Sequence, residues 1–203
     1  MKIKALLMPV LAIALAAAIL FGVSAGLADI RAKNIQAEHI AMMQRLLPGS
    51  MDFVIEPYTG DDDNIVSVHK AENGFVVETC VQGYADTITM MVGVSNEGSV
   101  TGLVVRDMHE TFGLGANALT DNDFLAQFLN TAGGVTVVSN SGNGYNHEAI
   151  AACPVVSGAA EDIEVDAITG ATVTSKAIAR SVNSAVAVVT GADAASAATT
   201  WGG

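Results

Sequence analysis

Four hydroxyl side chains gather in one short stretch near the end of the sequence. The stretch runs Asp166-Ala167-Ile168-Thr169-Gly170-Ala171-Thr172-Val173-Thr174-Ser175 and leads straight into a helical pattern. Unpaired backbone N–H groups in a first helical turn, with hydroxyls beside them, can hold an anion such as a phosphate. Gly170 and Ala171 let the backbone approach a bulky ligand, whereas Asp166 would repel a free phosphate and suits a hydroxyl or a cation better. This combination indicates phosphate chemistry on a threonine of the stretch.

The same stretch has a plainer interpretation, in which a Thr or Ser side chain caps the helix and the residues before it form a turn. Caps of this kind are widespread among helices. On the residues alone, both interpretations stay open.

A second candidate group is His109-Glu110-Thr111-Phe112-Gly113-Leu114-Gly115, which follows a predicted strand. His109 and Glu110 are either an acid–base pair or partners in a structural hydrogen bond. The segment Gly113-Leu114-Gly115 is too short to be a dinucleotide-binding fingerprint.

The elements that must position these residues are short strands and two helices. Apolar patterns predict strands at 53–55, 65–68, 74–81, 87–94, 100–105 and 135–138, with a hairpin turn at 95–98. A short helix with acidic residues in its first turn is predicted over 121–130. A longer helix over 175–189 would pack on the sheet through Ile178, Val182, Ala185, Val186 and Val189. The predicted fold class is α+β, with a largely antiparallel sheet and packed helices.

The N-terminus carries an uncharged run over residues 5–28, long enough to cross a bilayer as a helix. Lys2 and Lys4 precede it and favour a cytoplasmic N-terminus. A cleaved signal peptide is the alternative, and both interpretations place the rest of the chain outside the cytoplasm. The expected organisation is a transmembrane anchor (1–28), a stalk helix (29–49), an extracytoplasmic domain (50–190) and a loose tail (191–203).

The charge of the chain excludes nucleic acid as a partner. The 203 residues hold nine Lys and Arg against 21 Asp and Glu, and every acidic residue follows the apolar run. Binding to a phosphate backbone needs clustered basic side chains, which this body lacks. The two cysteines form no metal-binding motif, and no metal site is expected.

The motifs resemble those of a known family. The pattern Asp166-x-x-Thr169-Gly170-Ala171-Thr172 is similar to the flavinylation motif of FMN-binding domains, found in the G subunit of Rnf complexes and the C subunit of Na⁺-translocating NADH:quinone reductase. The 109–115 segment resembles the second signature of the family, with Phe112 in place of the usual proline. Gln82-Gly83-Tyr84 lies where these domains carry a Gly–aromatic segment. Chain length, single anchor and motif order resemble the Rnf protein more closely.

The resemblance implies a covalent FMN. The FMN phosphate would form a phosphoester with Thr172, made by a separate flavin transferase that uses FAD and Mg²⁺. The rest of the motif would complete the cofactor-binding site: Asp166, Thr169, Gly170, Ala171 and Thr174. The residues expected near the isoalloxazine ring are Glu110, Thr111, Leu114 and, with less support from the motif, Tyr84.

The function that the resemblance implies is electron transfer in an Rnf-type ion-translocating ferredoxin:NAD⁺ oxidoreductase. The chain would be a membrane-anchored carrier subunit, would not be catalytic alone, and would have the other Rnf subunits as partners. One alternative is a tethered covalent flavoprotein of another respiratory or extracellular pathway. The other is an exported binding module without redox activity.

Overall fold

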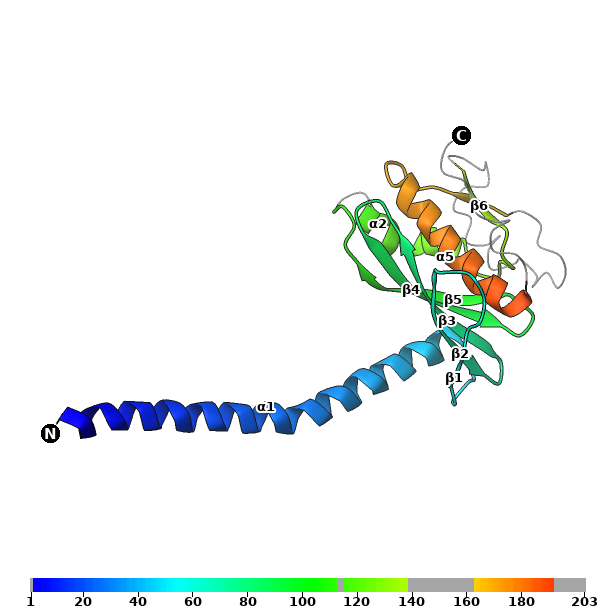
Figure 1. Cartoon of the computed structure of the whole chain (residues 1–203). Helices are drawn as coiled ribbons and strands as arrows, with labels where there is room; N and C mark the ends of the chain where they lie inside the picture. The colour runs from blue at the N-terminus through cyan, green and yellow to red at the C-terminus, as the bar shows by residue number, and fades with distance from the viewer. Residues whose placement is uncertain (1, 113–114, 139–162, 192–203) are drawn as a thin grey trace. The chain divides into compact units, whose positions relative to one another are not determined.

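A computed structural model of the chain describes residues 2–112, 115–138 and 163–191 (Figure 1). The chain divides into two compact units, Met1–Met42 and Met43–Gly203. The predicted tail beyond residue 191, residues 139–162, Leu114 and Cys153 lie outside the described residues.

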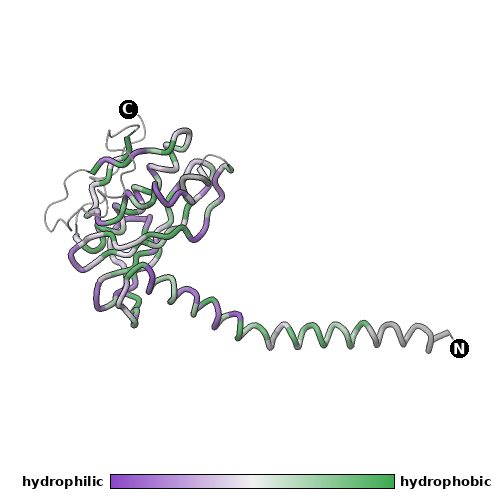
Figure 2. The backbone as a smooth tube through the Cα atoms, turned by 180° about the vertical axis from the view of Figure 1, so that it is seen from behind, coloured by the Kyte–Doolittle hydropathy of each residue, from purple (hydrophilic) through white to green (hydrophobic). Residues whose placement is uncertain are grey.

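The first unit is helical and belongs to a single helix, α1, over Lys2–Leu46. From Ile13 onward this helix is long and apolar enough to cross a membrane. Figure 2 shows the apolar stretch giving way to more polar residues toward the C-terminal end of the helix. The described helix runs on past residue 28 without a break, and the division into anchor and stalk at that residue stays a prediction.

The second unit is built on one five-stranded sheet. Its strands are β1 (Val54–Glu56), β2 (Ile65–Ala71), β3 (Gly74–Gln82), β4 (Thr87–Ser95) and β5 (Val100–Met108). They lie in the order β1-β2-β3-β4-β5, and each neighbouring pair is antiparallel. The predicted antiparallel sheet is therefore confirmed, and the predicted turn at 95–98 joins β4 to β5.

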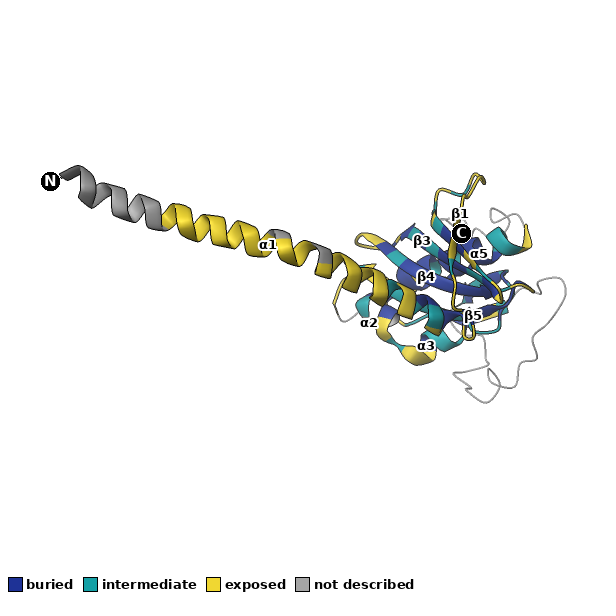
Figure 3. Ribbon diagram, turned by 90° about the horizontal axis from the view of Figure 1, so that it is seen from below, coloured by how far each residue is buried: buried dark blue, intermediate teal, exposed yellow. Residues whose placement is uncertain are grey.

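The two faces of the sheet bury different partners, because side chains alternate along each strand. On β3, Val77 belongs to the larger core, which α5 (Thr172–Thr190) completes. Its neighbour Val76 faces the opposite way and packs with Met43 and Leu46 at the end of α1 and with Leu47 just after it. Figure 3 shows that β3 and β4 are buried along most of their length. The sheet is thus a fixed platform for the loops at its ends.

The remaining elements follow β5. The helix predicted over 121–130 is present in shorter form as α3 (Asn122–Ala126), and a further short helix that was not predicted, α2 (Gly115–Thr120), precedes it. Asp121 caps α3 and accepts hydrogen bonds from the N–H groups of Asp123 and Phe124, so the acidic start was predicted correctly. Strands β6 (Val135–Val138) and β7 (Ile163–Asp166) form a separate, parallel two-stranded sheet. The sequence predicted β6 but not this pairing.

Helix α5 begins at Thr172, three residues before the predicted start at Ser175. The apolar periodicity that defines the helix starts later, because its first turn carries polar side chains. The predicted apolar face is confirmed, since Ile178, Val182, Ala185 and Val186 are buried and Val189 is partly buried. The correction matters for function, because it places Thr172 at the first position of the helix.

Candidate functional site

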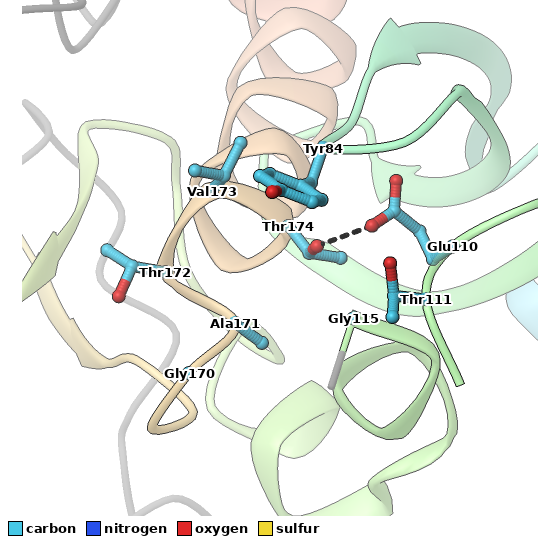
Figure 4. Close-up of a pocket in the computed structure, with 9 residues that line it drawn as sticks. All are labelled: Tyr84, Glu110, Thr111, Gly115, Gly170, Ala171, Thr172, Val173 and Thr174. Carbon is cyan, nitrogen blue, oxygen red and sulfur yellow. Dashed lines mark hydrogen bonds between the residues drawn. The ribbon is translucent and has the colours of Figure 1, made fainter. Parts of the chain in front are cut away.

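Three segments distant in the sequence meet around a cavity of about 460 Å³ (Figure 4). They are the β3–β4 loop, the segment after β5, and the turn that leads from β7 into α5. The lining residues are Tyr84, Glu110, Thr111, Gly115, Gly170, Ala171, Thr172, Val173 and Thr174. A volume of this size is typical of pockets that hold small organic ligands. Both motifs found in the sequence therefore line one site.

The turn before α5 leaves the start of the helix open. Gly170 has a φ of 82°, a left-handed conformation that favours glycine. Ala171 is the N-cap residue, and no side chain caps the helix. The interpretation of this stretch as a Thr or Ser cap is therefore wrong. The uncapped N–H groups and the positive end of the helix dipole are available to an anion.

The hydroxyls of the stretch differ in what they contact. Thr174 is buried, and its hydroxyl donates to Glu110 Oε2 at 2.8 Å. Ser175 is buried as well, donates to the carbonyl of Ala171 and accepts from the N–H of Ile168. Thr172 is exposed and lines the cavity, and no hydrogen bond engages its hydroxyl within the described part of the chain. Figure 4 shows its side chain pointing away from the Glu110–Thr174 pair.

Two other motif residues, Thr169 and Asp166, are not among the residues that line the cavity. Thr169 is exposed in the turn before Gly170. Asp166 ends β7 and is buried, and Gln127 holds its backbone from both sides. The amide of Gln127 accepts from the N–H of Asp166 at 3.0 Å and donates to its carbonyl at 3.4 Å. Sequence reasoning missed Gln127, because a glutamine 39 positions away has no motif of its own.

The second motif supplies a carboxylate and a loop. Glu110 and Thr111 line the cavity, Tyr84 faces them from the β3–β4 loop, and Leu114 lies outside the described residues. His109 does not pair with Glu110. Its Nδ1 lies 3.9 Å from Asp86 Oδ2, with both side chains largely exposed. An acid–base pair of His109 and Glu110 has no support in this geometry.

Comparison with known proteins places the chain in a family. The family model described as "FMN-binding domain" matches residues 83–187. A curated relative from Methanosarcina acetivorans, the G subunit of an ion-translocating oxidoreductase complex, is 32% identical over 76% of this chain and 77% of its own. The G subunit of the Na⁺-translocating ferredoxin:NAD⁺ oxidoreductase complex of Acetobacterium woodii is 31% identical over 76% of this chain and 75% of its own.

A third relative is the G subunit of the proton-translocating ferredoxin:NAD⁺ oxidoreductase complex of Clostridium ljungdahlii, 35% identical over 57% of this chain and 53% of its own. The matched region of the family model holds all three segments that line the cavity. The chain is a member of the FMN-binding domain family that includes the G subunits of ion-translocating oxidoreductase complexes.

Proposed function

We propose that the chain is the electron-transfer subunit of an Rnf-type ion-translocating ferredoxin:NAD⁺ oxidoreductase, with FMN joined covalently to Thr172. The observation that carries this proposal is the state of the Thr172 hydroxyl. It is exposed, has no hydrogen-bond partner among the described residues, and stands at an uncapped helix N-terminus beside the cavity.

The residues present fit a flavin mononucleotide. The open N–H groups at the start of α5 suit its phosphate. The cavity beside them is lined by an exposed tyrosine and by small residues at Gly115, Gly170 and Ala171, which leave room for a flat ring. FMN supplies reversible transfer of one or two electrons when it is bound. The protein contributes the tether, the position and the local charge.

The covalent bond would form by phosphoryl transfer from FAD, catalysed by a flavin transferase. The Thr172 oxygen forms a bond to the phosphorus on the flavin side of FAD, and the bond between that phosphorus and the bridging oxygen breaks. AMP leaves, and the hydroxyl proton passes to the transferase or to water. The uncapped N-terminus of α5 would stabilise the negative charge that remains on the diester.

The apolar part of α1 would anchor the protein in the membrane. Lys2 and Lys4 precede the apolar run, which favours a cytoplasmic N-terminus and an extracytoplasmic flavin domain. A covalent tether suits such a location, since a dissociating cofactor would be lost from the cell. FMN then relays electrons between centres of the other subunits, and the chain is not an enzyme by itself.

The test is affinity purification of the tagged full chain from native membranes in mild detergent. The proposal predicts co-purification of the other membrane subunits and bleaching of the flavin absorbance when NADH is added to the assembly. A flavin-bearing chain without those partners would favour a tethered flavoprotein of another pathway. A colourless chain would favour a binding module without redox activity.

A further inference from the structure

The carboxylate of Glu110 is the point at which the three cavity-lining segments are joined. Its Oε1 accepts a hydrogen bond from the N–H of Ala85 at 3.1 Å, in the β3–β4 loop. Its Oε2 accepts from the hydroxyl of Thr174 at 2.8 Å, in the first turn of α5. These contacts span 25 and 64 positions of sequence. Figure 4 shows the second of them beneath the Tyr84 side chain.

Two glycines pack against the same carboxylate. A Cβ added at Gly83 would collide with Oε1, and one added at Gly115 would collide with Oε2 and lie 2.7 Å from the hydroxyl oxygen of Thr174. Real side-chain carbons do not approach neighbours this closely. Because Gly83 and Gly115 have no side chains, the Glu110 carboxylate can occupy the space between them.

We infer that Glu110 is a positioning residue, which fixes the position of the Tyr84 loop relative to the first turn of α5 on the two sides of the cavity. Both of its oxygens are engaged by donors of the chain itself. The consequence for function, which rests on the proposed function, is that Glu110 sets how readily Thr172 accepts its flavin.

Glu110 is connected to Tyr84 and to Thr172 through short stretches of backbone. Ala85 directly follows Tyr84, and the loop is closed by a 2.9 Å hydrogen bond from the N–H of Gly83 to the carbonyl of Asp86. Thr174 lies two residues after Thr172 in the same helical turn. Loss of the carboxylate would release the loop at Ala85 and leave the buried Thr174 hydroxyl without its acceptor.

The test measures hydrogen exchange on the full chain in detergent, produced without flavin transferase, at the peptides that cover residues 83–87 and 172–176. Glu110→Ala should raise exchange of the 83–87 peptide at least about tenfold, a change of about 1.4 kcal/mol in opening free energy. Glu110→Gln should stay within about twofold of wild type. Its amide oxygen can still accept from Ala85, and its NH₂ can donate to Thr174.

Two further variants keep the test decisive. Glu97→Ala removes an exposed carboxylate from the β4–β5 turn and should change neither peptide. Thr174→Val keeps the shape of the side chain and removes only the hydroxyl that donates to Glu110 Oε2. It replaces Glu110→Ala in the test if circular dichroism shows that Glu110→Ala does not fold. It should speed exchange of the 172–176 peptide several-fold. Exchange of both peptides unchanged in Glu110→Ala, or as fast in Glu110→Gln as in Glu110→Ala, would overturn the inference.

Flavin attachment is followed separately by intact mass after incubation with FAD, Mg²⁺ and transferase. Attachment to Glu110→Ala should be at least about tenfold slower than to wild type, and attachment to Glu110→Gln close to wild type. Equal rates in Glu110→Ala and wild type would contradict the effect on Thr172. A wild-type chain that takes up no flavin would refute the covalent site, while the exchange measurement would still decide the role of Glu110.

Discussion

The hydroxyl of Thr174 donates to the carboxylate of Glu110 at 2.8 Å, and this contact joins the two sequence motifs of the chain. The hydroxyl two residues earlier, on Thr172, is exposed at the cavity. The two threonines of one motif thus differ in their contacts, since the Thr174 hydroxyl is bonded to Glu110 and no hydrogen bond among the described residues engages the Thr172 hydroxyl.

The glycine at position 115 leads to the first prediction. Inside a helix alanine is favoured over glycine by about 1 kcal/mol, and Gly115 is the first residue of α2, so helix propensity alone gives no reason for Gly115→Ala to destabilise the chain. The structure nevertheless predicts a loss of about 1–3 kcal/mol, because the new methyl group would displace Glu110. Chemical denaturation of the full chain in detergent measures the difference. Gly26→Ala, where a Cβ meets nothing within 4 Å, is the matched control and should not destabilise.

The second prediction concerns the buried hydroxyl pair of Thr79 on β3 and Ser181 on α5, which are hydrogen-bonded to each other. Thr79→Val or Ser181→Ala should each cost about 1–3 kcal/mol, because the remaining hydroxyl stays buried without its partner. The double variant should cost clearly less than the two single costs combined. Strict additivity in the denaturation free energies would show that the pair is not coupled.

The third prediction tests the support behind the motif. Gln127→Ala removes both hydrogen bonds to the backbone of Asp166 and should cost about 1–3 kcal/mol. The same variant should slow flavin attachment to Thr172 without abolishing it, since the strand that leads into the motif loses its anchor. Intact mass against time measures the effect. Gln36→Ala, on the exposed surface of α1, should attach flavin at the wild-type rate.

Structural features that depend on residues close together in the sequence were predicted, and features that depend on contacts between distant residues were not. The strands of the main sheet and the buried face of α5 follow local periodicity, and they were found. The parallel pairing of β6 with β7 joins segments more than 20 residues apart, and no local pattern encodes it.

The same division applies to the candidate site. Thr172 was singled out by a local sequence motif, and in the structure it lines the cavity. The links from Glu110 to Ala85 and from Gln127 to Asp166 are contacts between distant residues, and only the fold brings these partners together. The start of α5 was placed three residues late because its first turn lacks apolar residues.

The fourth prediction concerns the charge beside the cofactor. A carboxylate in the cavity lining disfavours the added negative charge of a reduced flavin, which lowers the reduction potential. Glu110→Gln should therefore raise the midpoint potential, by an amount on the order of tens of millivolts. Potentiometric titration of the flavin-bearing chain measures this shift. The exposed Glu97→Gln should leave the potential unchanged, and an equal shift in both variants would argue against a local effect.

The central claim is that Thr172 carries the flavin. Its most direct test is a denaturing gel viewed under ultraviolet light, with each chain co-expressed with an active flavin transferase and checked by intact mass. Wild type and Thr190→Ala, which removes a hydroxyl at the opposite end of the same helix, should fluoresce and gain the mass of one FMN less water. Thr172→Ala should be dark and unmodified. A fluorescent Thr172→Ala band, or a dark wild type beside a flavinylated control protein, would contradict the claim.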